Sequence, residues 1–246
     1  RPLPARRALG IAVGLSLGGL VAAPAQAFEF DFGEDWTGNL DTTVSYGVSR
    51  RTQDADLDLI GKSNLNPTIG ALSNSAQRGA PGRWSVNSDD GNLNYRNGGD
   101  IFSNAFKITS ELSLNYGEDT GAFVRGTYFY DFANVNKDFL SRAAKNKVGK
   151  RGRILDAFVF HNFAFDGGQE LNLRLGQQVV SWGESTFIQS GINVVNAVDV
   201  SQLRVAGAEL KEAFLPNNMV FASLKFTENL SAEALYLLEF EQTEPE

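Results

Sequence analysis

Few side chains in this sequence could carry covalent chemistry. The chain has 1 His and no Cys, so disulfides and thiol catalysis are excluded and a Ser-His-Asp arrangement would have to use His161. The neighbours of His161 are aromatic, and position 163, on the same strand face, is Phe rather than Ser. Gly183 and Ser185 lack the second Gly of a nucleophile elbow. We therefore predict no enzymatic activity, no metal site and no cofactor.

Charged side chains at alternate positions of extended segments form a second candidate group. Arg125, Asp156 and Arg174 lie on the polar faces of such segments, and charged rings of this kind set ion selectivity where they line a pore. We predict that they line a lumen. The plainer interpretation is that they are water-exposed groups that pair with one another for little energy. The acidic residues expected to face the two arginines are Asp41, Glu111, Asp131 and Asp156.

A third candidate is the long segment 177–216. It has so few solvating charges near 188–200 that it suits open water poorly. We expect it to fold inward and narrow a lumen, with Trp182 packed on the wall. The alternative is that it covers the rim from outside. The residues predicted to line this constriction are Trp182, Glu184, Asp199 and Arg204.

A basic stretch precedes residue 154. We expect it to be a solvated surface loop, with charge attraction to anionic lipopolysaccharide as a further interpretation. Its cationic residues are Lys145, Lys147, Lys150, Arg151 and Arg153.

The composition narrows the class of protein. The chain has 246 residues with 22 Lys and Arg against 29 Asp and Glu, a formal net charge of -7. This balance argues against nucleic-acid binding, which depends on clustered Lys and Arg that release counterions. Phe is abundant, with 18 residues, and there is 1 Met. That mixture favours amphipathic strands over helical cores.

Residues 1–27 have the pattern of a secretory signal peptide. Arg1, Arg6 and Arg7 form a basic start, residues 8–23 are an apolar run, and Ala25-Gln26-Ala27 is a small-x-small cleavage site. The run is shorter than the about 20 apolar residues of a spanning helix, which disfavours an uncleaved anchor. We expect export through the Sec pathway, and we expect the sequence to be clipped at its start.

Alternation of apolar and polar residues with a period of two recurs along the rest of the chain, residues 28–246. A helix would scatter these apolar residues around its axis. The seven strands that the pattern predicts are 37–50, 101–116, 121–132, 153–165, 171–176, 220–227 and 231–240.

The connections between these strands alternate between long and short. Turns at 117–120, 166–169 and 228–230 are tight, whereas the connections around 51–100, 134–152 and 181–216 are long. Short periplasmic turns and long outer loops are typical of an outer-membrane barrel, whose interfaces carry aromatic residues. We predict an all-β fold, a transmembrane antiparallel up-and-down β-barrel, with His161 at an interface. Because such barrels have even strand numbers, we expect the seven strands to be the N-terminal part of a longer barrel, truncated at the C-terminus.

Two blocks of sequence carry a family resemblance. Residues 99–132 and 175–219 resemble the domain-of-unknown-function 1302 family of Gram-negative outer-membrane proteins, particularly those of pseudomonads and related bacteria. The second block is the more specific, because the run from Gln177 through Trp182-Gly183-Glu184-Ser185 to Lys211-Glu212 is long and unusual. Asn196-Ala197 departs from the family, where a Pro is expected. The resemblance implies a full-length protein longer than this chain.

The resemblance also implies a role in envelope transport. We expect an outer-membrane channel or transporter for small hydrophobic or aromatic compounds or lipids, with polar inward faces that lack hydrophobic filling. The alternative is a non-conducting structural or assembly component of an envelope transport system. The expected partners are outer-membrane lipid and lipopolysaccharide, with periplasmic or inner-membrane transport proteins beside them, and no nucleic acid.

Overall fold

A computed structural model describes residues 21–22, 26–85, 93–181, 195–208 and 210–243. The chain divides into two compact units. The larger comprises residues 20–48 and 103–246, and the described part of the smaller is residues 49–85 and 93–102.

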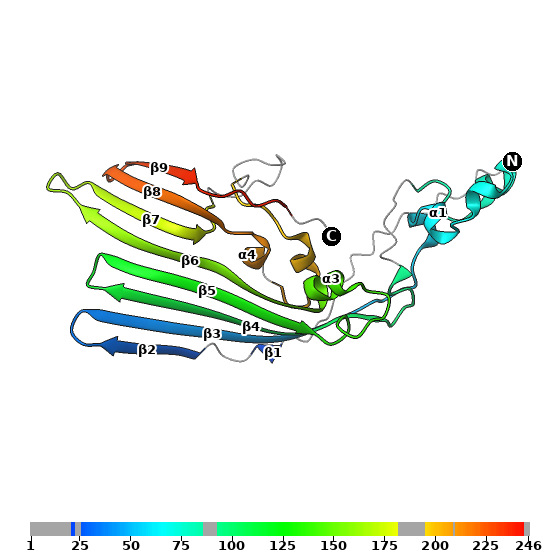
Figure 1. Cartoon of the computed structure of the whole chain (residues 1–246), viewed down its shortest axis with the longest axis horizontal. Coiled ribbons are helices and arrows are strands. Elements are labelled where there is room, and N and C mark those ends of the chain that lie inside the picture. The colour runs from blue at the N-terminus through cyan, green and yellow to red at the C-terminus, as the bar shows by residue number, and fades with distance from the viewer. Residues whose placement is uncertain (1–20, 23–25, 86–92, 182–194, 209, 244–246) are drawn as a thin grey trace, which may run out of the picture. The chain divides into compact units, whose positions relative to one another are not determined.

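The larger unit is built on one antiparallel sheet whose strands follow one another in chain order (Figure 1). β1 and β2 pair one after the other along the same edge of β3, and β9 forms the opposite edge, so the sheet is open. The all-β, up-and-down antiparallel prediction is thereby confirmed. The strands are β1 (Val21–Ala22), β2 (Gln26–Phe32), β3 (Trp36–Arg50), β4 (Ile101–Tyr116), β5 (Thr120–Asp131), β6 (Lys150–Ala164), β7 (Glu170–Gln178), β8 (Asn217–Thr227) and β9 (Leu230–Leu237).

The predicted count of seven strands is wrong, because β2 precedes the first predicted strand. Phe28, Phe30 and Phe32 alternate with acidic residues, and β2 pairs with β3 from Gln26↔Thr42 to Phe32↔Trp36. The backbone of residues 26–27 and all of β1 fall within the segment predicted to be cleaved. Because β1 and β2 share one edge of β3, the sheet is eight strands wide rather than seven. The odd strand number on which the expected truncation was argued is therefore not observed.

Four tight turns lie together at one end of the sheet, on the left in Figure 1. They join β2 to β3, β4 to β5, β6 to β7 and β8 to β9, so the predicted alternation of short and long connections holds and extends by one turn. Gly117 starts the β4–β5 turn with a φ of 60°, a conformation that residues with a Cβ avoid. We call this end the turn end.

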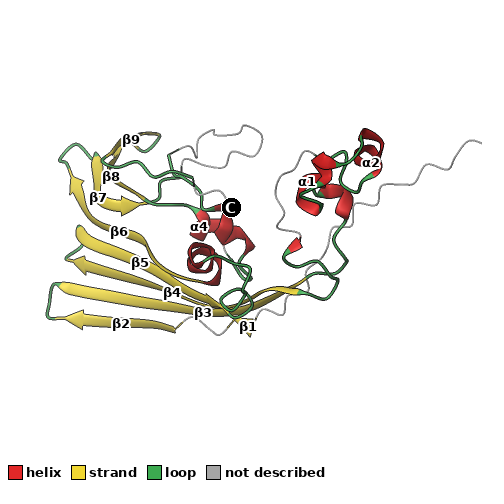
Figure 2. Ribbon diagram, turned by 45° about the vertical axis from the view of Figure 1, so that its right-hand side comes forward, coloured by secondary structure: helices red, strands yellow, loops and turns green. Residues whose placement is uncertain are grey.

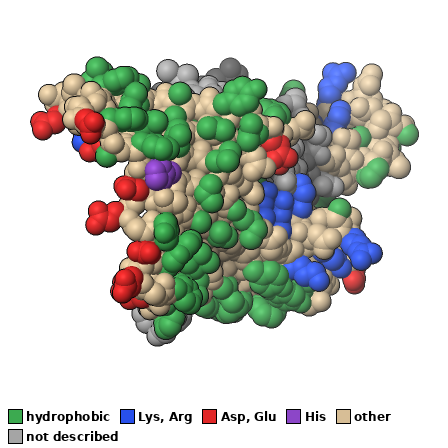
Figure 3. Space-filling view, turned by 60° about the vertical axis from the view of Figure 1, so that its left-hand side comes forward, with side chains coloured by type: hydrophobic (Ala, Val, Ile, Leu, Met, Phe, Trp, Pro, Cys, Tyr) green, Lys and Arg blue, Asp and Glu red, His purple; other side chains and the backbone are tan. Residues whose placement is uncertain are grey.

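The two faces of the sheet differ in chemistry. One row of facing residues crosses six strands and is entirely apolar, and several of its members are exposed; we call its side the open face. Figure 3, in which the single His is purple, shows the hydrophobic side chains in green around it and acidic side chains toward one edge. The apolar row consists of Leu114, Ala122, Val159, Leu175, Val220 and Tyr236.

The opposite side, which we call the covered face, carries charged and aromatic residues. Phe123 and Phe158 face each other there, as do Arg125 and Asp156. Charged and aromatic side chains are therefore mixed on this side of the sheet. Phe123 and Phe129 share the parity of Arg125 along β5, so they must lie on the same face.

Short helices occur in the connections, and among the described residues no helix is long and apolar enough to cross a membrane. In the larger unit they are α3 (Arg142–Ala144), the π-helix η4 (Lys145–Gly149), the 3-10 helix η5 (Val200–Arg204) and α4 (Leu210–Ala213). In the smaller unit they are η1 (Leu57–Leu59), α1 (Lys62–Leu65), η2 (Ile69–Ala71) and α2 (Asn74–Gly79).

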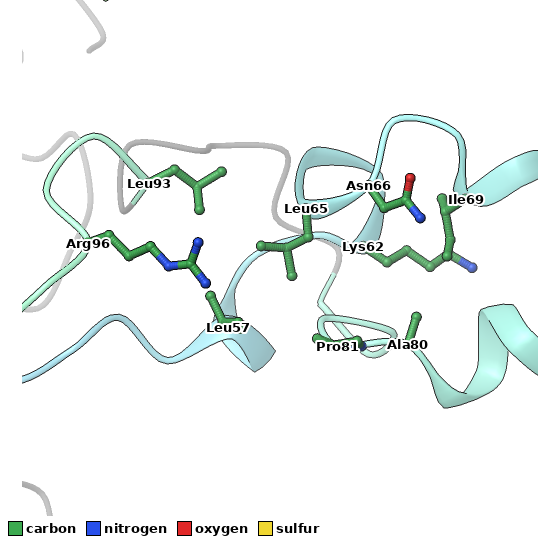
Figure 4. A pocket seen from close by; sticks show the side chains of 9 residues that line it. All are labelled: Leu57, Lys62, Leu65, Asn66, Ile69, Ala80, Pro81, Leu93 and Arg96. Atoms are coloured by element: carbon green, nitrogen blue, oxygen red, sulfur yellow. The ribbon is translucent and has the colours of Figure 1, made fainter.

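The smaller unit consists of the connection between β3 and β4 and the adjoining residues of these two strands. Its ends are joined by hydrogen bonds from Arg51 N to Asp100 O (2.8 Å) and from Gly99 N to Arg51 O (2.7 Å), and Ile60 is fully buried. A hollow is lined by apolar residues and two cations, and Figure 4 shows the Arg96 side chain reaching toward Leu57. The lining residues are Leu57, Lys62, Leu65, Asn66, Ile69, Ala80, Pro81, Leu93 and Arg96.

Candidate functional site: the covered face of the sheet

Residues 195–216 of the β7–β8 connection fold back onto the covered face, and Figure 2 shows α4 over one side of the sheet. The two arms of the segment pair with each other through Asp199 N to Ala213 O (2.8 Å) and Leu215 N to Ala197 O (2.8 Å). This pairing satisfies backbone groups that would otherwise be buried without partners. The segment, which we call the covering segment, is therefore a folded part of the unit.

An ion pair between Lys107 and Glu212 joins the covering segment to β4. Lys107 Nζ lies 2.6 Å from Glu212 Oε2, and both side chains are buried. The ammonium also donates to Gly207 O at 2.8 Å, and Thr109 Oγ1 donates to Glu212 Oε1 at 3.2 Å. These extra hydrogen bonds matter because a buried ion pair offsets its desolvation cost only when its other polar atoms are also bonded.

A second charged contact joins the covering segment to β6. Arg151 Nη1 and Arg153 Nη1 donate to Asp199 Oδ2 at 2.7 and 3.0 Å, while Asp199 Oδ1 accepts from Ser201 N and Ser201 Oγ. Asp199 is fully buried, so its carboxylate anchors the segment and presents no open charge. The prediction that Arg151 and Arg153 belong to a solvated basic loop is therefore wrong.

An apolar contact lies between these two charged anchors. Ala105 and Phe129 of the sheet form a buried cluster with Val205 and Ala206 of the covering segment. Gly47 of β3 makes the close approach possible, because a Cβ there would lie 2.9 Å from Ala206 C and Ala206 Cβ. Together the contacts fix the segment to β3, β4, β5 and β6.

Asparagines fix the two ends of the covering segment. Asn196 Oδ1 accepts from Val180 N at 2.9 Å and Asn196 Nδ2 donates to Leu215 O at 3.1 Å. Asn217 Nδ2 donates to Val195 O at 2.8 Å. The family resemblance leads us to expect a Pro at Asn196-Ala197. The side chain of Asn196 makes two hydrogen bonds that a Pro side chain could not make.

Arg125 and Asp156 form a charge cluster on the covered face. Arg125 Nη2 lies 2.5 Å from Asp156 Oδ2, and Arg125 Nη1 lies 3.8 Å from Glu111 Oε1. A β-bulge between Arg125 and Gly126 leaves Leu155 of β6 without a partner. The extra residue shifts the alternation, so that Arg153 and Asp156 both lie on the covered face.

Arg174 lies nearer the turn end, between aromatic rings. Its Cζ is 5.6 Å from the ring centroid of Phe158 and 5.5 Å from that of Phe221, distances at which a cation is attracted to a ring face. Its Nε donates to Asn172 Oδ1 at 3.0 Å, and Asn172 Nδ2 donates to Asn162 Oδ1 at 2.6 Å. The guanidinium is thus held in one orientation.

The structure brings some of the predicted residues together and separates others. Arg125, Glu111 and Asp156 form one cluster, as expected, whereas Asp131 accepts from Ser103 Oγ and from the backbone N–H groups of 104, 133 and 134. Asp131 therefore does not face the arginines. Trp182, Glu184 and Ala25 lie outside the described residues, as do the side chains of Arg204 and Ala27.

The sequence alone did not indicate four residues that hold the covering segment in place, Lys107, Thr109, Glu212 and Gly47. Lys107 lies on a polar strand face, but nothing in one sequence indicates its partner, which lies 105 residues away.

His161 contacts Thr120 Oγ1 through Nδ1 at 2.7 Å and packs edge-to-face on Phe163. No group of three or more His, Asp or Glu placed to hold a metal ion occurs among the described residues.

Comparison with known proteins gives one match. A family model for a protein of unknown function (DUF1302) matches residues 7–246. No curated protein and no solved structure matches the chain.

Proposed function

The chain belongs to the DUF1302 family, and we propose that its sheet is part of an outer-membrane β-barrel that passes small hydrophobic or aromatic compounds, or lipids, across the outer membrane. The covered face would line the lumen and the open face would contact lipid.

The observation that carries the proposal is the exposed apolar surface of the open face. In its apolar row, Val159 is 53% exposed, Leu175 51% and Tyr236 71%. Exposing a large apolar side chain to water costs about 1.5–3 kcal/mol relative to burial, and contiguous apolar patches are rare on soluble monomers. Contact with lipid removes that cost.

The length of the strands supports a membrane crossing. A tilted transmembrane strand needs about 9–11 residues, and β4 has 16, β5 has 12 and β6 has 15. In a bilayer, the sheet edges at β9 and at β1 and β2 would both need partners, because unpaired backbone groups are costly in hydrocarbon.

Aromatic residues lie toward both ends of the strands, as expected for rings at the two membrane interfaces. At the turn end, the rings of Trp36 and Tyr116 lie 5.0 Å apart, and both residues are exposed. At the other end, the rings of Tyr130 and Phe132 also lie 5.0 Å apart. The proposal includes Sec export by residues 1–27 and contact of the exposed Lys147 and Lys150 with lipopolysaccharide.

Planar-bilayer recording of the refolded full-length protein tests the proposal. We expect discrete conductance steps that a hydrophobic or aromatic substrate reduces, together with substrate flux into vesicles. A folded protein that inserts but passes neither ions nor substrate would contradict the proposal. It would favour the assembly component, which the extensive covering of the lumen-side face by residues 195–216 also supports.

A further inference from the structure

Arg174 differs from the other cations of the covered face. Each of the others makes an ion pair with a carboxylate of the described residues, whereas Arg174 makes none with them. A half-buried guanidinium loses part of its hydration, and an ion pair usually compensates for that loss. Arg174 has no such ion pair with the described residues. The paired cations are Lys107, Arg125, Arg151, Arg153 and Lys225.

We propose that Arg174, with Phe158 and Phe221, binds the carboxylate of an amphipathic anion, meaning a carboxylate attached to an aromatic ring or to an aliphatic chain. The inference rests on the proposed function, for which it names the substrate class.

The orientation of Arg174 leaves its terminal nitrogens available. Asn172 accepts from Nε only, and the terminal N–H groups have no acceptor among the described residues. The planar fork of a guanidinium matches the two oxygens of a carboxylate, and such charge-assisted bonds are about twice as strong as neutral ones. A neutral hydrophobic compound would gain only the ring contacts.

Aromatic residues beside Arg174 provide a surface for the apolar body. Phe160 and Phe221 are its direct neighbours across the strands, on β6 and β8, and the rings of Phe158 and Phe123 lie 5.5 Å apart. Gly121 leaves room for the Phe160 ring, because a Cβ at Gly121 would lie 2.5 Å from Phe160 Cζ. The four rings make an apolar wall around one cation.

A hollow at the turn end borders the asparagine pair that holds Arg174. Its polar lining includes Asn162, Asn172, Ser223 and Lys225, together with the carboxylates of Asp119, Glu170 and Glu228. Asn172 is both part of this lining and the hydrogen-bond partner of Arg174, two residues farther along β7. The hollow and Arg174 therefore share the asparagine pair, and an anion bound to the guanidinium would lie beside that pair.

Matched pairs of probes test the inference on the refolded full-length protein in non-ionic detergent. Isothermal titration calorimetry compares decanoate with decanol and benzoate with benzyl alcohol, so that each pair differs in the carboxylate. We expect the carboxylate of at least one pair to bind at least about tenfold more tightly than its alcohol. The pair that shows the difference distinguishes an aliphatic from an aromatic ligand.

Three variants identify the group responsible. Arg174→Gln should abolish the preference for the carboxylate, Arg174→Lys should keep part of it because the charge remains, and Arg142→Gln, in α3, should keep all of it. Circular dichroism and heat-modifiable gel mobility check that each variant folds. An equal preference in Arg174→Gln, or no carboxylate preference in the wild type, would overturn the inference.

The two proposals can fail separately. Conductance with no carboxylate preference would overturn the inference and leave the channel standing. Carboxylate binding by a protein that conducts nothing would overturn the channel and leave the binding site standing.

Discussion

Lys107 Nζ and Glu212 Oε2 lie 2.6 Å apart, although 105 residues separate them in the chain, and both side chains are buried. One residue belongs to a central strand and the other to the covering segment. Their contact therefore couples the position of residues 195–216 to the sheet that they cover.

Replacing Glu212 by Gln should release the covering segment. The change leaves the Lys107 ammonium buried without its anion, and removing one partner of a buried pair costs about 3–5 kcal/mol. Urea unfolding of the refolded protein and protease cleavage within 195–216 are the measurements. The control is Glu170→Gln, whose pair with Lys225 is exposed and is worth about 0–1 kcal/mol. Equal stability of the two variants would contradict the anchoring role of Glu212.

The Asp199→Asn variant should alter both the covering segment and the charge of the covered face. Asp199 Oδ2 accepts from Arg151 and Arg153, so its neutralisation removes one negative charge from beside two guanidinium groups. In the conducting protein we expect a shift toward anion selectivity, measured as a change in reversal potential across a salt gradient.

Asp166→Asn is the control for that shift, because Asp166 lies in the exposed β6–β7 turn. Both variants lose one negative charge, but only Asp199 contacts cations of the covered face. A shift of the same size in both would show that overall charge, and not the buried contact, sets selectivity.

The strands could be predicted from the sequence because a period of two is visible within each one. The strands predicted at 101–116 and 171–176 correspond to β4 and β7 of the structure. β2 is not among the predicted strands although Phe28, Phe30 and Phe32 alternate with acids, because this alternation extends over only five residues, 28–32. Short patterns at the border of another predicted segment are the least reliable part of a sequence-based assignment.

The covered face could be predicted only in part. Arg125, Asp156 and Arg174 were found because charge at alternate positions is a local signal. The bulge at Leu155 gives no such signal, since it inserts a single residue that changes which side chains face one another. The contacts that join the covering segment to β6 and β4 link residues 46 to 105 positions apart, and one sequence does not indicate which distant groups will meet.

Substituting Gly47 by Val should push the covering segment off β3. A Cβ at Gly47 would lie 2.9 Å from backbone and side-chain atoms of Ala206, which have little room to move. Overpacking of this kind costs about 1–3 kcal/mol. Gly126→Ala is the control in the same sheet, because a Cβ there would make ordinary contacts of 3.5 and 3.6 Å. Protease sensitivity of residues 195–216 should rise in Gly47→Val alone.

Leu175→Arg tests whether the open face contacts lipid. Leu175 lies between Val159 and Val220 in the apolar row and is 51% exposed. A charge at the middle of a lipid-facing strand costs about 2–4 kcal/mol, whereas the same change on a water-exposed surface is usually within about 0.5 kcal/mol. We therefore expect Leu175→Arg to lower the free energy of unfolding from lipid vesicles by about 2–4 kcal/mol.

Ser223→Arg is the matched control, because Ser223 lies on the covered face of β8 opposite Asn172. A lumen-side Arg stays in contact with water and polar groups, so this variant should insert and unfold like the wild type. The two substitutions add the same charge to neighbouring strands and differ only in the face that receives it. If both variants were equally stable in vesicles, the open face would not be the lipid-facing side, and an interface with another protein would have to account for its exposed apolar residues.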